Sequence, residues 1–259
     1  MDLKTTTQDG APTSIDSMNL PLISIITVVY NSVKTIEQTI LSVIGQSYPN
    51  KEYIIIDGGS TDGTVEIIKK YESNLSYWVS EPDKGIFDAM NKGISMAKGE
   101  LIGIINADDW YQENIFATIA ERFRETGSDH VIHGLIRNFL DEEFYSMVGN
   151  SIRRLRYDMI QHPTCFIPQK LYRTFGKYDI SLRHSADYDL ILRFVHKGVK
   201  FSFVEKPIVN FRLGGNSSNT WAEKEMYRVR VKHHVISKTE GFLRIILVSV
   251  FSLAKRFLK

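Results

Sequence analysis

ELIGIINADDWY, residues 100–111, is the stretch that decides the fold of this 259-residue chain. The apolar run from Leu101 to Ile105 is rich in isoleucine and predicts a buried β-strand. After Asn106 and Ala107, the run is followed by a pair of adjacent aspartates, Asp108 and Asp109. A turn needs only one Asp, and neighbouring carboxylates repel each other. This strand ending therefore raises the prospect of a ligand that offsets two negative charges.

The segments before this strand alternate between strand-like and helical patterns. Apolar runs at 22–31, 52–58 and 76–82 predict three further strands, and apolar residues at helical spacing within 84–99 predict a helix. Such alternation predicts an α/β fold with a mostly parallel central sheet flanked by helices. Ligands of such sheets bind beyond the carboxyl ends of the strands.

Polar clusters follow three of these predicted strands. Tyr30 and Asn31 follow the first strand, residues 57–60 follow the second, and the acidic pair follows the last. Because the carboxyl ends of parallel strands lie at one edge of a sheet, we expect the three clusters to face one crevice. The glycines of DGGSTDGT, residues 57–64, would let a ligand approach the backbone closely, although they also fit a plain turn.

The motifs that are present favour a metal-assisted phosphate site over the common nucleotide loops. The chain has no G-x-x-x-x-G-K-[ST], which excludes a P-loop, and no G-x-G-x-x-G after the first strand, which argues against a dinucleotide site. A divalent cation such as Mg²⁺ or Mn²⁺ takes oxygen ligands, often one or two carboxylates plus substrate phosphates. The acidic pair fits that chemistry, and its alternative explanation is a turn or a helix cap.

Beyond the acidic pair the pattern is helical over 112–126, strand-like and irregular over 130–149, and helical again over 185–198. Asp187 and Asp189 fall in or just before the first turn of this last helix, where the helix dipole favours carboxylates. The dipole alone explains both residues. The alternative is that one of them is a general base at the mouth of the crevice.

Composition indicates an ordinary globular protein, with 43% hydrophobic and 24% charged residues. The single cysteine, Cys165, excludes an intrachain disulfide and fits a reducing, cytoplasmic compartment. The first 20 residues are polar and have no apolar core of a signal peptide, so we expect a flexible leader. The small net charge of +2 gives no reason to expect a nucleic-acid partner.

Taken together, the segments resemble the family 2 inverting glycosyltransferases, which have the GT-A fold. The resemblance rests on ISIITVVYN, YIIIDGGSTDGT, SEPDKGIFDAMNKGISMAKGELIGIINADDW and, less closely, QHPTCF with ADYDLILR. These segments span about 23 to 193 and occur in the order found in the family. The resemblance implies a nucleotide-sugar donor, with a UDP-sugar favoured, a Mn²⁺ or Mg²⁺ cofactor, and a glycan or lipid-linked glycan as acceptor.

The resemblance also implies a role for each matching residue. Tyr30 and Asp57 would lie against the nucleoside, Asp83 near the base or ribose, Asp108 at the ribose or sugar, Asp109 on the metal, Asp187 as catalytic base, and His162 and Arg212 near the acceptor or diphosphate.

Two positions depart from the pattern of the family. The usual DDGS is DGGS here, so Gly58 lacks a carboxylate that can read the base. The usual ED pair is Ala186-Asp187, which leaves Asp189 as a rival base. We favour Asp187, because Asp189 precedes the apolar face of the helix and stands four residues before Arg193, a spacing typical of an ion pair.

The resemblance suggests a division of the chain into a leader at 1–20, a glycosyltransferase domain at 21–219 and a basic helical extension at 220–259. Within the domain, 21–111 would bind the nucleotide sugar, and 112–219 would bind the acceptor and carry the base. The extension contains nine Lys and Arg against three Glu. Such an asymmetry favours an anionic partner.

The end of the extension, 241–259, has an uncharged run of ten residues, Ile245 to Ala254, which falls short of the roughly 20 that span a bilayer. On a helix its polar side chains gather in an arc of roughly 140°. This pattern predicts a basic amphipathic helix in peripheral contact with an anionic membrane, on the inner face of the cytoplasmic membrane. The alternative is a helix packed on the core or on a partner subunit. The arc comprises Arg244, Ser249, Ser252, Lys255, Arg256 and Lys259.

Two other classes of function share parts of this pattern. Nucleotidyltransferases that form sugar nucleotides also combine an α/β sheet with metal-binding aspartates, but they begin with a glycine-rich basic loop, and TVVYNSVKT is not one. A non-catalytic module that binds sugar nucleotides is the other alternative, and the presence of Asp109 and Asp187 argues against it. The resemblance places the reaction in bacterial synthesis of cell-surface polysaccharide or lipopolysaccharide, including O-antigen.

Overall fold

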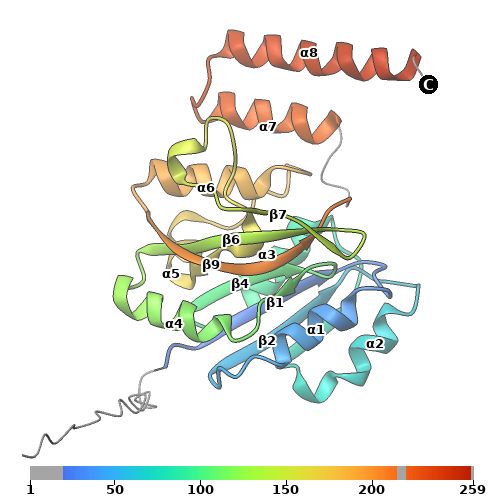
Figure 1. Cartoon of the computed structure of the whole chain (residues 1–259), viewed down its shortest axis with the longest axis vertical. Helices are drawn as coiled ribbons and strands as arrows, with labels where there is room; N and C mark the ends of the chain where they lie inside the picture. Colours follow the sequence, from blue (N-terminus) through green and yellow to red (C-terminus); the bar gives the residue numbers. More distant parts are fainter. Residues whose placement is uncertain (1–19, 215–219, 258–259) are drawn as a thin grey trace, which may run out of the picture.

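The structure is a computed structural model that describes residues 20–214 and 220–257, with side chains described as far as residue 252 (Figure 1). The predicted leader, apart from Leu20, lies outside the described residues, as does Lys259. The division into leader, domain and extension therefore stays a prediction.

The described residues form one nine-stranded sheet in the order β3-β2-β1-β4-β8-β6-β9-β5, with β7 paired to β6. The first four strands of this order are parallel to one another, as predicted. The other half is mixed, because the three-residue strand β8 runs antiparallel to both of its neighbours. The strands are β1 (Ile23–Val29), β2 (Lys51–Asp57), β3 (Tyr77–Ser80), β4 (Leu101–Asn106), β5 (Trp110–Tyr111), β6 (His130–Leu140), β7 (Glu143–Val148), β8 (Phe166–Pro168) and β9 (Lys200–Arg212).

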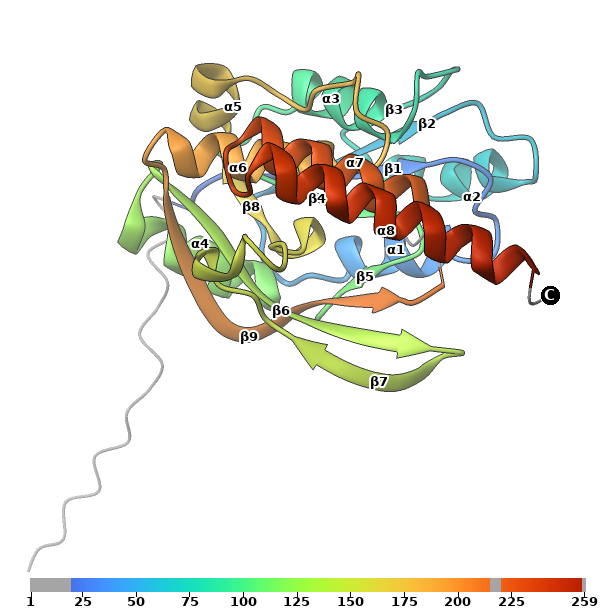
Figure 2. The same cartoon turned by 90° about the horizontal axis from the view of Figure 1, so that it is seen from above.

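Helices cover both faces of the sheet, so the α/β class is confirmed (Figures 1 and 2). Alternate residues of β1 separate the two cores: Ile25 packs with one set of helices and Ile26 with the other. One face carries α1 (Ile36–Ile44), α2 (Thr64–Lys70) and α4 (Ile115–Thr126), and the other carries α3 (Ile86–Met96), α5 (Gln169–Phe175) and α6 (Ala186–His196).

The strand register brings the polar strand ends together. Val29 of β1 lies opposite Asp57 of β2, and Val28 lies opposite Asn106 of β4. Asp57 is in turn opposite Ser80 of β3. The four parallel strands therefore end at one edge of the sheet, which is the arrangement that the sequence predicted.

Two helices, α7 (Thr220–Lys232) and α8 (Lys238–Phe257), stack beyond α6 and form the outermost layers (Figure 1). The helical prediction for this extension is confirmed. Helix α8 packs on α7, since a Cβ added at Gly241 would lie 2.3 Å from Cγ2 of Val231. Within the described residues, no helix is both long enough and apolar enough to cross a bilayer.

Candidate active site

The loop after β1 is docked onto the glycine-rich loop after β2. The Asn31 backbone N–H donates to Oγ of Ser60 at 2.7 Å, and Oδ1 of Asn31 accepts from the N–H of Thr61 at 2.9 Å. Asn31 adopts φ 48°, a left-handed conformation that Asn tolerates better than most residues. Next to this fixed loop, the Tyr30 side chain is 64% exposed, so its ring is available to a ligand.

Asp57, the last residue of β2, holds this loop in place through hydrogen bonds. Its side chain is fully buried, and its carboxylate accepts hydrogen bonds from the N–H groups of Gly59 and Ser60 and from the hydroxyls of Ser60 and Ser80. Four hydrogen bonds from this loop and a neighbouring strand thus converge on this one side chain. Asp57 thus shapes the loop where a nucleoside contact was predicted, and that contact itself remains a prediction.

Gly58, in the loop after β2, lies next to the side chain of Asp83. A Cβ added at Gly58 would lie 2.6 Å from Oδ2 of Asp83 and 3.4 Å from Cδ2 of Tyr30. The other oxygen, Oδ1 of Asp83, accepts from the N–H of Gly85 at 2.7 Å. The absent side chain at position 58 therefore leaves room for the Asp83 carboxylate beside Tyr30, a contact between positions 25 residues apart that the local pattern does not contain.

The acidic pair lies at the end of β4 in a site that disfavours charge. Asp109 is fully buried, and burial, followed by the nearby charge of Asp108, raises its pKa well above the usual value. Burial also raises the pKa of Asp108. Oδ1 of Asp109 accepts from the N–H of Arg212 at 3.1 Å, whereas its Oδ2 finds no hydrogen-bond partner among the described residues.

A second buried oxygen at this strand end also lacks a partner within the part of the chain that the structure describes: Oδ1 of Asn106, the last residue of β4. The sequence analysis did not single out Asn106. A polar residue that closes an otherwise apolar strand is the signal that could have found it. Unsatisfied buried oxygens are costly, and a bound cation is one way to satisfy them.

Arg212 brings a positive charge to the acidic pair from the end of β9. Its guanidinium donates to the backbone carbonyl of Asp108, to the side chain of Gln38 and to Glu142, and it lies 4.6 Å from the ring centroid of Trp110. Its own N–H reaches Asp109. Arg212 therefore lies beside the acidic pair, with part of its hydrogen-bonding capacity used within the chain, and its role near the acceptor or diphosphate stays a prediction.

The donor set at this strand end fits a hard cation. Carboxylate and amide oxygens of Asp109, Asp108 and Asn106 are ligands that Mg²⁺ and Mn²⁺ accept. Across the described residues, no group of three or more His, Cys, Asp and Glu side chains is placed to hold a metal. A cation here would need oxygens from a ligand, which is how Mg²⁺ commonly binds with substrate phosphates.

His162 and Asp187 form a partly exposed pair at the start of α6. Nδ1 of His162 lies 3.7 Å from Oδ2 of Asp187, while Oδ1 of Asp187 accepts from the Tyr188 N–H at 2.8 Å. Burial raises the pKa of Asp187 to about 6 and lowers the pKa of His162 to about 4. His162 is therefore neutral near pH 7, and Asp187 is a carboxylate of unusually high basicity.

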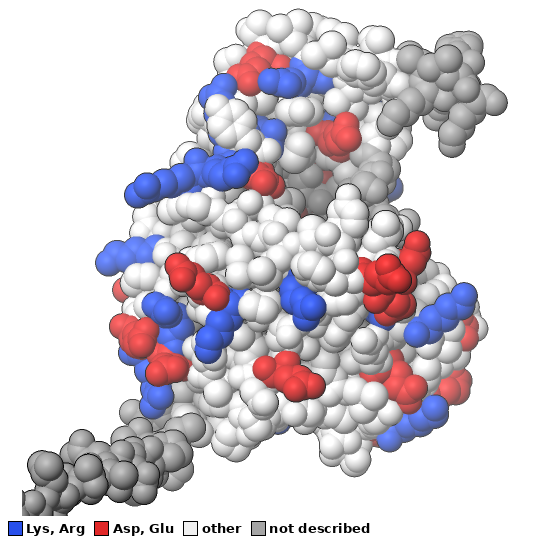
Figure 3. All heavy atoms as spheres, viewed as in Figure 1, with Lys and Arg blue, Asp and Glu red and all other residues white. Residues whose placement is uncertain are grey.

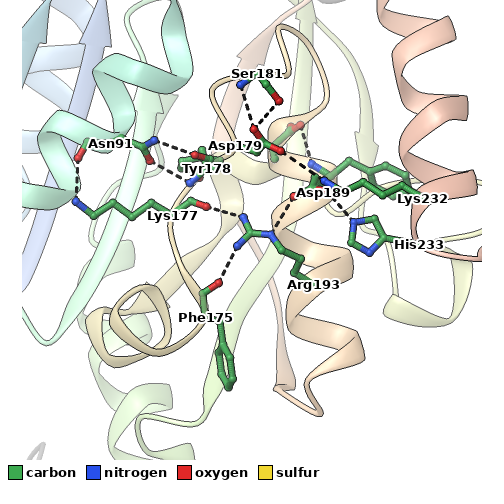
Figure 4. A network of polar contacts seen from close by, with 12 residues as sticks. Asn91, Phe175, Lys177, Tyr178, Asp179, Ser181, Asp189, Arg193, Lys232 and His233 are labelled. Atoms are coloured by element: carbon green, nitrogen blue, oxygen red, sulfur yellow. Dashed lines mark hydrogen bonds and ion pairs between the residues drawn. The ribbon is translucent and has the colours of Figure 1, made fainter.

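Asp189, two residues further along α6, has a different surrounding (Figure 4). Its carboxylate is held by Arg193 at 2.9 Å, by Lys232 at 2.9 Å and by His233 at 2.8 Å. Burial acts to raise its pKa, but the hydrogen bonds from these partners bring the pKa below the usual value. The predicted pair with Arg193 is confirmed, and a carboxylate with three such partners is poorly suited to accept a proton.

Comparisons with known proteins agree with this fold and assign the chain to a family. The family described as Glycosyl transferase family 2 matches residues 24–179, which is more than half of the chain. An uncharacterized glycosyltransferase of Mycobacterium tuberculosis is 31% identical over 179 residues, covering 67% of this chain and 68% of its own. A PGL/p-HBAD biosynthesis glycosyltransferase of Mycobacterium bovis is 26% identical, covering 82% and 84%.

Solved structures share the fold at low sequence identity. TarS of S. aureus in complex with UDP-GlcNAc superposes with a TM-score of 0.68 at 18% identity and covers 86% of this chain and 70% of its own. The mannosyltransferase PcManGT of Pyrobaculum calidifontis, in complex with GDP-Man and Mn²⁺, gives 0.65 at 16% identity, covering 93% and 73%.

The family match and the fold define a glycosyltransferase of the GT-A type. The chain belongs to glycosyl transferase family 2. The matched segment ends at residue 179, before Asp187, so the role of the base helix has to be argued from its own surroundings.

Proposed function

We propose that the protein transfers a sugar from a nucleoside-diphosphate sugar to an acceptor hydroxyl with inversion at the anomeric carbon, assisted by a divalent cation. The observation that carries this proposal is the buried Oδ2 of Asp109, which has no partner in the described part of the chain and stands beside Asp108 and Arg212. The complexes of TarS with UDP-GlcNAc and of PcManGT with GDP-Man and Mn²⁺ support the same class of donor.

The residues at the end of β4 would hold the cation. Asp109 would ligate it directly through Oδ2, with Asp108 and Asn106 as the nearest further oxygen donors. When bound, a Mn²⁺ or Mg²⁺ ion would supply positive charge that stabilises the departing diphosphate. Arg212 adds a fixed positive charge at the same strand end, and it needs no cation to do so.

The donor would lie along the edge formed by the first two loops. The exposed ring of Tyr30 offers a surface on which a base can stack, and the Asp83 carboxylate beside it can accept from a base N–H or from ribose hydroxyls. Asp57 would contribute by fixing the loop between them. A UDP-sugar is favoured, and the GDP-Man complex of PcManGT makes a guanine donor the main alternative.

Asp187 is the proposed base. Oδ2 would accept the proton of the acceptor hydroxyl, because Oδ1 already accepts from Tyr188. The hydroxyl oxygen forms its bond to the anomeric carbon while the bond from that carbon to the diphosphate oxygen breaks on the opposite face. The diphosphate leaves with the electron pair, and the configuration inverts, with a transition state of oxocarbenium character as in glycoside hydrolysis. His162, being neutral, would shield the Asp187 carboxylate from water and hold its orientation without cancelling its negative charge.

A donor panel tests the proposal. The purified full-length chain is incubated with nucleotide sugars, glycan or lipid-linked acceptors and Mn²⁺, and the released nucleotide is identified. Free nucleoside diphosphate together with a glycosylated acceptor is the expected result. Pyrophosphate formed from a nucleoside triphosphate and a sugar phosphate would instead assign the protein to the nucleotidyltransferases. Binding without turnover of any donor would point to a non-catalytic module.

The outer face of α8 supports contact with an anionic membrane that carries the acceptor. Six large apolar side chains repeat along this face and are all exposed, and the upper edge of the molecule is mostly uncharged (Figure 3). Exposed Arg244 and Lys238 border the stripe, as expected for a helix lying in an anionic interface. The stripe comprises Phe242, Leu243, Ile246, Leu247, Val250 and Phe251.

One residue of the predicted polar arc of α8 lies against protein instead of solvent. Ser252 of the polar arc faces α7, where its Oγ accepts from the Thr220 hydroxyl at 3.3 Å. Helix α8 thus packs on protein and still presents its apolar stripe outward. Lys255, Arg256 and Lys259 of the arc lie where side chains are not described.

Vesicle flotation tests this contact. Leu243→Asp combined with Leu247→Asp should lower binding to vesicles of phosphatidylglycerol and phosphatidylcholine at least about tenfold, because two exposed leucines that would insert into the interface are replaced by carboxylates. A control with the same charge change on exposed polar positions outside α8, Ser73→Asp combined with Asn74→Asp, should bind nearly as the wild type does. Equal binding of all three proteins would contradict a role for the stripe.

A further inference from the structure

The segment that carries Asp187 into α6 is held by a side chain of α7. The Glu225 carboxylate accepts hydrogen bonds from three consecutive backbone N–H groups, those of Arg183 at 3.0 Å, His184 at 2.6 Å and Ser185 at 2.8 Å. Ser185 is the N-cap residue of α6, and its side chain makes no capping bond in the described structure. The turn that starts α6 therefore depends on a carboxylate from elsewhere in the chain.

Further contacts from α7 reach α6 on the other side of Asp187. Buried Arg230 donates to the hydroxyl of Tyr188 at 3.2 Å and lies 5.6 Å from its ring centroid. Lys232 and His233, at the end of α7, hold Asp189 (Figure 4). Helix α7, which lies outside the matched family segment, thus contacts the residues on both sides of Asp187.

We propose that Glu225 is a positioning residue for the transfer reaction: by binding the backbone of residues 183–185, it fixes the first turn of α6 and aims Asp187 at the acceptor hydroxyl. This proposal rests on the proposed function, in which Asp187 is the base. Under this proposal, α7 supports the proposed base on α6 and also packs against α8.

Position matters here because a proton acceptor has to lie within hydrogen-bond distance of the acceptor hydroxyl. A displacement of about 1 Å at a reacting group can cost about 100-fold in rate. Asp187 occupies the first turn of α6, where the backbone has few hydrogen bonds of its own to resist such a displacement. Three bonds from one carboxylate supply that resistance.

Glu225 also acts on Asp187 through its charge. The groups that face Asp187 are His162 and Cys165 from the segment before β8, Tyr178 from the loop after α5, and Glu225 from α7. After burial, the negative charge of Glu225 contributes to the raised pKa of Asp187. Removing that charge should lower the pKa of Asp187, and the acid limb of the rate profile should move to lower pH.

The experiment compares Glu225→Gln and Glu225→Ala with a control on the same helix, Glu223→Gln, which removes an exposed carboxylate. Full-length proteins are assayed with the donor found in the panel, over pH 4.5–8.5. We expect kcat to fall about tenfold in Glu225→Gln and further in Glu225→Ala, since the amide keeps one acceptor oxygen. Affinity for UDP or GDP with Mn²⁺ should be unchanged, and the control should match the wild type.

Hydrogen exchange gives a readout that does not depend on activity. Amides of residues 183–185 should exchange faster in Glu225→Ala, while peptides from β1 and β4 should exchange at the wild-type rate. Unchanged exchange, an unchanged kcat, or an equal loss of nucleotide binding and kcat would overturn the positioning role. Asp187→Asn separates the two proposals: if that variant stays active, the assignment of the base fails, whatever the Glu225 variants do.

Discussion

The strand-end site and the α6–α7 interface hold their buried carboxylates in opposite ways. At the strand ends, Asp109 has one oxygen without a partner in the described chain, and its pKa is raised by burial and by Asp108. At the interface, Asp189 has three basic partners, and its pKa is lowered. Asp187 stands in the interface but resembles Asp109 electrostatically, because burial raises its pKa to about 6.

The comparison separates carboxylates with a functional role from those with a structural role by whether the chain supplies cationic partners for their charge. When the chain supplies all the partners of a buried carboxylate, removing that carboxylate is strongly destabilising, because its partners are left uncompensated. A buried carboxylate left without a cation of its own lowers stability, and such a cost is commonly found where a ligand or a proton completes the site. Asp109 and Asp187 are of this second kind, and Asp189 is of the first.

The largest effect on activity is expected for Asp187→Asn. An amide cannot accept the proton, so kcat should fall by about 10²–10⁴-fold. Binding of UDP or GDP with Mn²⁺, measured by calorimetry, should stay near the wild-type value because the nucleotide residues are untouched. Asp129→Asn, which removes an exposed carboxylate paired with Lys170, is the control. Retention of most of the activity by Asp187→Asn would remove it as the base.

Asp109→Asn should uncouple donor binding from the cation. We expect affinity for the nucleotide in Mn²⁺ to fall about 100-fold, while affinity in EDTA stays the same. The same substitution removes a buried carboxyl group whose ionisation is disfavoured by burial and by Asp108, so it should raise the stability of the ligand-free protein by about 1 kcal/mol, or Tm by about 2–4 °C. A lower Tm together with unchanged Mn²⁺ dependence would show that Asp109 is structural.

The pH profile gives an intermediate effect. Asp187 acts as a base only when ionised, and its pKa is about 6, so kcat should fall about tenfold per pH unit below pH 6. His162, with a pKa of about 4, stays neutral through this range and should not contribute a limb near pH 6. The residual activity of Asp187→Asn should lack this limb, and a limb that persists in the variant would belong to another group.

Local pattern predicted much of the fold and which polar residues gather at the strand ends. The alternation of apolar runs located the first four strands to within two residues at each end, and the polar strand ends converge as expected. The ion pair of Asp189 with Arg193 also followed from sequence, because residues four apart share a helix face. In each case the interacting groups are close in sequence or follow a regular repeat.

Contacts between distant residues could not be predicted in this way. Neither Glu225 nor Lys232 shares a motif with α6, and the meeting of Gly58 with Asp83 depends on how two loops fold back. The strand directions in the second half of the sheet also depend on tertiary packing, since β8 has only three residues. Such features arise from long-range pairing, which a single sequence does not encode as a local period.

Asp189→Asn should have the smallest effect on activity and a large effect on stability. The substitution leaves Arg193, Lys232 and His233 without their shared carboxylate, which should cost about 3 kcal/mol and lower Tm by about 6–12 °C. Well below that Tm, kcat should change less than about threefold, because Asp187 keeps its contacts with His162 and Tyr188.

A matched control for this last variant is Asp179→Asn, which removes a more exposed partner of the same Lys232, at 3.4 Å. An exposed pair contributes little, so its loss should cost less than about 1 kcal/mol. The opposite outcome, an Asp189→Asn protein as stable as the wild type but inactive, would make Asp189 the base. The charge balance around a carboxylate would then be a poor guide to its role in this protein.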